Sequence, residues 1–97
     1  MFARIINAPL QPGAATEATD YFRESIGTEL KKQTGFLNSR FLVNESTNQC
    51  LMVTLWKTEE DRQKSEEGYL KMALEGMKPH LAGPPAITHY EVTVQVV

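Results

Sequence analysis

The stretch from Cys50 to Asp61, "CLMVTLWKTEED", decides the fold. Its first seven residues are almost all apolar and favour a strand, as expected of a strand that is covered on both faces. A polar run then follows, and Thr58 with Asp61 three residues later resembles the capping box that starts a helix. The only tryptophan of the chain, Trp56, stands at the junction. We therefore predict a buried strand that runs directly into a helix.

The segments on either side of this stretch predict the remaining elements. Residues 36–44 and 50–56 are joined by polar turn formers, which predicts an antiparallel hairpin. Residues 2–9 and 86–97 predict two further strands, the last with strict alternation to the end of the sequence. Apolar residues at helical spacing predict one helix from Thr16 to a stop at Gly35 and another from Thr58 to Pro79.

The order βαββαβ predicts a single α+β domain over residues 1–97 with a ferredoxin-like fold. Right-handed crossovers place both helices on one face of a four-stranded antiparallel sheet. The other face of the sheet also carries apolar residues, since Leu51, Val53 and Leu55 alternate with Cys50, Met52, Thr54 and Trp56. The same face of a second copy is the most economical cover, so we expect a homodimer through the sheet face, a dimeric α/β barrel.

Composition excludes several classes of function. The charges, 10 basic against 12 acidic, and a longest basic run of two lysines exclude a nucleic-acid-binding surface. No apolar run is long enough to cross a membrane and no signal peptide is recognisable, so we expect a cytoplasmic protein. The single Cys50 predicts a small buried apolar residue instead of a reactive thiol.

The charged and titratable residues give few further signals. The run "EEDRQKSEE", residues 59–67, predicts a solvated helix face. Two histidines, His80 and His89, stand nine residues apart without cysteines or regularly spaced carboxylates, so no metal site is predicted.

The chain length, the element order and the stretch "TGFLNSRFLVNESTNQCLMVTLWKTEED" resemble the antibiotic biosynthesis monooxygenase-like domains of the dimeric α/β barrel superfamily. Gly35 and Phe36 after the first helix and Trp56 at the end of the hairpin match the pattern of that family, and the resemblance covers essentially the whole chain. It implies oxygenation of a small aromatic or quinol-type molecule without metal or organic cofactor. Such an enzyme supplies a dry pocket, a proton acceptor and hydrogen bonds to a developing oxyanion.

Five residues are candidates for a pocket between the sheet and the helices. Asn7, Trp56 and Tyr69 are the candidate substrate-binding residues, and His89 or His80 is the candidate proton acceptor. Each also has a purely structural interpretation: a hydrogen-bonded amide for Asn7, core or dimer packing for Trp56 and Tyr69, and solvated positions for the histidines.

Two other functions remain open. The chain could be a non-catalytic homodimeric module that binds a small apolar ligand or regulates a partner. The resemblance also extends to a heme-degrading branch, which uses an Asn on the first strand together with a Trp and a His on the second helix. Asn7 matches, but Ser65 stands where an active-site His is common, and the nearest candidate iron ligand is His80. Heme degradation therefore ranks last.

Overall fold

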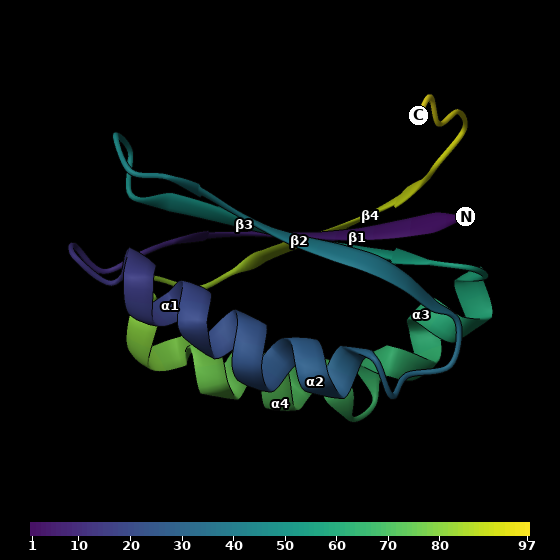
Figure 1. Ribbon diagram of the computed structural model, residues 1–97, viewed down its shortest axis with the longest axis horizontal. Helices are drawn as coiled ribbons and strands as arrows, with labels where there is room; N and C mark the ends of the chain where they lie inside the picture. The colour runs from purple at the N-terminus through teal and green to yellow at the C-terminus, as the bar shows by residue number, and fades with distance from the viewer.

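Four strands form one antiparallel sheet in the order β2-β3-β1-β4, and the helices all lie on one of its faces (Figure 1). The computed structural model describes residues 1–97. Its elements are β1 (Phe2–Pro9), α1 (Ala15–Tyr21), the π-helical η1 (Phe22–Ile26), α2 (Gly27–Leu30), β2 (Phe36–Asn44), β3 (Gln49–Trp56), α3 (Glu59–Glu66), α4 (Tyr69–Met77), the 3-10 helix η2 (Lys78–His80) and β4 (Ala86–Glu91). The predicted ferredoxin-like fold is confirmed. None of the helices has the length and apolar character needed to span a bilayer.

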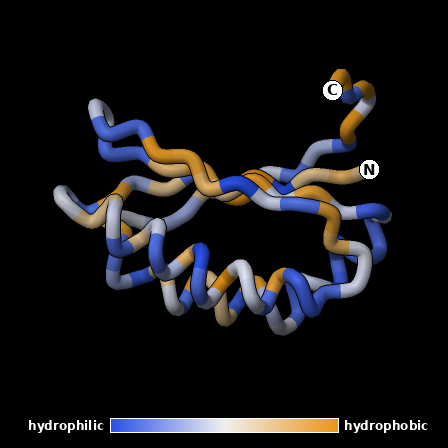
Figure 2. The backbone as a smooth tube through the Cα atoms, in the orientation of Figure 1, coloured by the Kyte–Doolittle hydropathy of each residue, from blue (hydrophilic) through white to orange (hydrophobic).

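The central strand β3 alternates as predicted. Cys50, Met52, Thr54 and Trp56 are buried beneath the helices, whereas Leu51, Val53 and Leu55 lie on the uncovered face. The buried core joins this inner face to α1, η1 and α4. Apolar segments lie in the sheet, and another apolar segment lies at the C-terminal end of the chain (Figure 2).

The last strand is shorter than the sequence predicts. β4 ends at Glu91, because Glu91 already pairs with Phe2, the first residue of β1. Beyond it, only the Val92 N–H donates to the Met1 carbonyl, and residues 93–97 pass the end of the sheet without a neighbouring strand. Val94 and Val96 are therefore exposed, and the prediction of a strand to residue 97 was wrong.

Both predicted helices are interrupted. The first begins at Ala15 instead of Thr16 and contains a π-helical turn, in which the Gly27 N–H donates to the Phe22 carbonyl five residues earlier. The second starts as predicted, because the Asp61 N–H donates to Thr58 Oγ1 at 3.1 Å. It then breaks at Gly68, whose φ and ψ of −131° and −61° are not helical, so α3 and α4 are separate.

Candidate functional site

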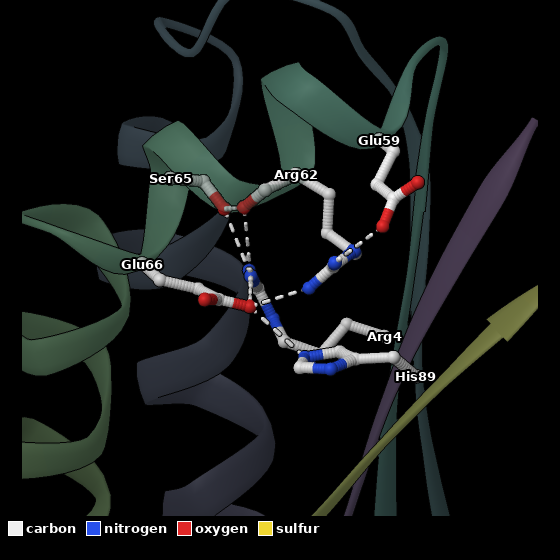
Figure 3. A network of polar contacts seen from close by, with 6 residues as sticks. All are labelled: Arg4, Glu59, Arg62, Ser65, Glu66 and His89. Atoms are coloured by element: carbon white, nitrogen blue, oxygen red, sulfur yellow. Dashed lines mark hydrogen bonds and ion pairs between the residues drawn. The ribbon is translucent and has the colours of Figure 1, made fainter.

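A buried cluster of polar side chains, which we call the Arg4 cluster, joins β1 and β4 to α3 (Figure 3). It consists of Arg4, Trp56, Arg62, Ser65, Glu66, Tyr69 and His89. Arg4 points toward the helices because every second residue of β1 faces that way, and its side chain is only 1% exposed. Its Nη1 donates to Ser65 Oγ at 2.8 Å and, more weakly, to the Arg62 carbonyl at 3.5 Å. Ser65 Oγ donates in turn to that carbonyl at 2.6 Å, so the hydroxyl fixes the guanidinium against α3.

Two aromatic rings lie against the same guanidinium. The Arg4 Cζ atom is 5.4 Å from the centroid of the Trp56 ring and 5.8 Å from that of Tyr69. Both distances are within the range of cation–π attraction. Trp56 is completely buried and meets Phe36 edge to face. The structure thus brings together Trp56 and Tyr69, which the sequence proposed as neighbours, and adds Arg4 to them.

Glu66 closes the cluster on its solvent side. Its Oε1 accepts from Arg62 Nη1 at 2.7 Å, lies 2.9 Å from His89 Nε2 and 3.8 Å from Arg4 Nη1. His89 reaches it because it pairs with Arg4 across β1 and β4 and so shares the helix-facing side. The side chains of Glu66 and His89 are 32% and 41% exposed, so this pair forms the border between the cluster and water.

Burial dominates the electrostatics of the cluster. Desolvation lowers the pKa of Arg4, with Arg62 adding to this and the charges of Tyr69 and Glu66 opposing it. Burial raises the pKa of Tyr69 to about 12, although the Arg4 charge acts in the other direction. The phenol therefore stays neutral near pH 7. Outside the cluster, Cys50 is buried as predicted, and this burial raises the pKa of its thiol.

Several donors in the cluster have no acceptor. Arg4 Nε and Nη2 and Trp56 Nε1 are buried and make no hydrogen bond. A guanidinium has five N–H bonds, so one on Nε and two on Nη2 are unpaired, together with the indole N–H. A buried polar group without a partner costs about 1–3 kcal/mol. Such a set of donors suits an oxygen-bearing group, above all an oxyanion or a carboxylate.

The other candidates from the sequence lie elsewhere. Asn7 is exposed on the uncovered face, where it lines a cleft of about 450 Å³, because Arg4, Ile6 and Ala8 occupy the helix-facing positions of β1. The expectation that Asn7 lines a pocket between sheet and helices was therefore wrong. His80 lies in η2, where its carbonyl accepts from the Gln11 N–H beyond the far end of β1. Hence His80 and His89 do not share a site.

Comparison with known proteins gives the family. The model of the antibiotic biosynthesis monooxygenase family matches residues 1–74. The chain belongs to this family. A search of curated proteins found no match.

Several solved structures share the fold of this family member, and each aligns with it over nearly the whole of both chains. MhuD, solved with two manganese protoporphyrin IX molecules per active site, has a TM-score of 0.81 and 23% identity and covers 100% of this chain and 99% of its own. A Streptomyces coelicolor monooxygenase in complex with nanaomycin D has a TM-score of 0.76 and 16% identity, with 99% and 90% covered. A Nitrosomonas europaea protein of unknown function has a TM-score of 0.79 and 18% identity, with 99% and 92% covered. At these identities the likeness shows the fold alone.

Arg4, at the centre of the cluster, was not among the site residues predicted for this antibiotic biosynthesis monooxygenase family member. The signal was present, since Arg4 is a charged residue on the same face of an apolar strand as Ile6 and Ala8. The run 59–67 was predicted to be solvated, and this was wrong for two residues, Arg62 and Ser65, which are 7% and 2% exposed. Five clefts of about 270 to 660 Å³ occur on the surface, and no member of the cluster lines any of these five. The unpaired donors of Arg4 and Trp56 are buried.

Proposed function

We propose that the protein is a cofactor-independent monooxygenase whose substrate is a small phenol-type aromatic molecule bound at the Arg4 cluster. The unpaired buried donors on Arg4 and Trp56 carry this proposal. They match what an oxyanion needs, and those of Arg4 lie beside the rings of Trp56 and Tyr69, two of the predicted substrate-binding residues. Family membership supports the reaction class.

Each residue has a distinct role in this proposal. Arg4 Nε and Nη2 and the indole N–H of Trp56 donate to the oxygen of the deprotonated substrate, as donors in a dry site stabilise developing charge. Ser65 is a positioning residue, because its hydroxyl accepts from Arg4 Nη1 and so fixes the orientation of the guanidinium. His89, in contact with Glu66 at 2.9 Å, accepts the proton of the substrate.

The reaction balances without a cofactor. Loss of a proton converts a phenol-type substrate with an activated CH₂ group into an electron-rich anion. The anion passes one electron to dioxygen, and the resulting radical and superoxide combine to form a C–O bond. The peroxide takes up the proton and loses water to leave a carbonyl. In sum, CH₂ and O₂ give C=O and H₂O.

Access to the donors lies between β4 and α3. Glu66 and His89 are the cluster residues with substantial exposure, and their contact spans the two elements. Substrate entry therefore requires the side chains of this pair to separate, which would open a path between β4 and α3 while Ser65 still holds Arg4. Arg62 and Glu66 both lie in α3, so their ion pair at 2.7 Å would be kept, whereas the contacts of Glu66 with His89 and Arg4 would be lost.

Oxygen uptake with anthrone tests the proposal. We expect consumption of one O₂ per anthrone and transfer of ¹⁸O from ¹⁸O₂ into anthraquinone. Trp56→Phe keeps the ring but removes the N–H, and should lower kcat by about 10²–10³-fold, as for loss of one oxyanion donor. His89→Gln should also lower kcat, whereas the matched control His80→Gln, remote from the cluster, should not.

Other outcomes would favour the alternatives. Wild-type turnover that Trp56→Phe leaves unchanged would refute the role of the unpaired donors. Binding of anthrone without oxygen uptake would favour a non-catalytic ligand-binding module. A shifted Soret band on titration with hemin would favour heme chemistry instead.

We further propose that the uncovered face of the sheet is the surface through which two copies associate. Ile5, Val53 and Leu55 lie on that face with Leu42 and Tyr90, and the last two are 45% and 55% exposed. An apolar sheet face of this kind is characteristic of an interface. Sedimentation at micromolar concentration should give a dimer, and Val53→Lys should give a monomer. A wild-type monomer under these conditions would contradict the proposal.

A further inference from the structure

A cleft of about 490 Å³ lies between the helical segment α1–η1–α2 and the edge strand β2. Its apolar residues are Phe22 and Leu30 from the helix and Phe36, Leu37 and Phe41 from the strand. The rings of Phe22 and Phe41 are stacked, with centroids 5.1 Å apart and planes inclined by 20°. This volume is in the range of small-molecule sites. No member of the Arg4 cluster lines the cleft.

Both walls of this cleft depart from regular structure. On the helix wall, η1 is π-helical, and π-helical turns occur frequently at functional sites. On the strand wall, the register of β2 against β3 shifts between Phe36 and Asn38, and such bulges are common beside binding sites. Gly27 also lines the cleft, where the absence of a side chain leaves room. The displaced Leu37 is 47% exposed at the rim.

The charge of the cleft is positive although the chain has a net charge of −2. Arg23 and Lys31 are its charged lining residues, and no carboxylate lines it. Arg23 pairs with Asp20 at 3.0 Å, whereas Lys31 makes no ion pair. An anionic ligand would therefore find an uncommitted cation at Lys31 and a second cation nearby.

We infer that this cleft binds a small aromatic carboxylate. The aromatic ring would lie against the Phe22 and Phe41 pair, because aromatic rings favour offset or edge contacts at these separations. The carboxylate would reach Lys31 at the rim, with Arg23 adding to the attraction. The site is separate from the one proposed for oxygenation, so either can fail without the other.

Binding of 2-naphthoate, followed by ¹H–¹⁵N chemical shifts, tests the inference. We expect shifts centred on Gly27, Leu37 and Ser39. Lys31→Glu should weaken binding about tenfold, by loss of a cation and gain of an anion. The matched control Lys71→Glu, in a different groove, should leave binding unchanged. The uncharged analogue 2-naphthol should bind more weakly than 2-naphthoate.

Three results would overturn the inference. The first is the absence of any shift at millimolar 2-naphthoate. The second is a set of shifts centred on the Arg4 cluster or on the groove around Lys71. The third is equal binding of 2-naphthoate and 2-naphthol with no effect of Lys31→Glu. Leu37→Ser, at an exposed position, should weaken both compounds and so checks the apolar contribution independently of charge.

Discussion

Replacing Arg4 with methionine tests whether the buried guanidinium stabilises the fold. Methionine has a similar unbranched length and no donors, so it can fill the space beside Trp56 and Tyr69. The groups left behind keep other partners, because Ser65 Oγ still donates to the Arg62 carbonyl. Glu66 likewise keeps its contacts with Arg62 and His89. We therefore expect Arg4→Met to fold.

The opposing free-energy terms for Arg4→Met are of similar size. The variant loses a charge-assisted hydrogen bond worth about 1.5–3 kcal/mol and two cation–π contacts worth about 0.5–2 kcal/mol each. It gains about 1–3 kcal/mol for each unpaired nitrogen that is no longer buried, and Arg4 has two. The free energy of unfolding should therefore change by less than about 2 kcal/mol. Ser65→Ala should instead destabilise the fold by about 1–3 kcal/mol, because it leaves Nη1 with only its long contact to a carbonyl.

Urea unfolding followed by the fluorescence of Trp56 measures both variants. With a slope of about 1–3 kcal/mol per molar urea, the midpoint for Ser65→Ala should fall by about 1 M, and that for Arg4→Met should move less. A loss above about 4 kcal/mol for Arg4→Met, the size expected of a large cavity, would refute the reasoning. It would mean that the two unpaired nitrogens are in fact well satisfied in solution.

Three further changes test the fold. Because the pKa of Tyr69 is about 12 when folded and about 10 when unfolded, stability should fall as the pH rises from 10 to 12. At pH 11.5 the wild type should lose about 2 kcal/mol more than Tyr69→Phe, relative to pH 9, and equal urea midpoints for the two would contradict this. Gly35→Ala should cost more than Gly13→Ala by thermal unfolding, since both residues have φ near +79° but a Cβ at Gly35 would clash with the side chain of Asp61. Thr58→Ala should cost about 1 kcal/mol by removing the cap of α3, and no change in melting temperature would exclude that contribution.

The fold was predictable because its signals are local and periodic. The alternation of residues 50–56 gave the two faces of β3, and the turn formers that follow residue 43 gave the hairpin. The same alternation applied to β1 would have placed Arg4 beside Ile6 beneath the helices and Asn7 on the other face. The resemblance to a family predicted that Asn7 lines the site, whereas the alternation of the strand predicts that Arg4 faces the helices.

Other features depend on contacts that the sequence does not display. The end of β4 is set by where β1 begins, which is a property of strand register. The burial of Arg62 and Ser65 depends on α3 lying across Arg4, so the charged run alone could not reveal it. The proximity of His89 to Glu66 likewise follows from the pairing of β1 with β4.

The contacts that hold α3 on the sheet are polar, which makes this helix prone to local unfolding. Its buried residues are Arg62 and Ser65, neither of them apolar, whereas α4 buries Tyr69, Leu70, Ala73 and Met77. Cooperative units with little buried apolar surface have the smallest free energies of local unfolding. The amides of α3 should therefore exchange with solvent well before those of β1 and β3, through an opening that leaves the core intact. This places a labile helix directly over the most deeply buried charge of the protein.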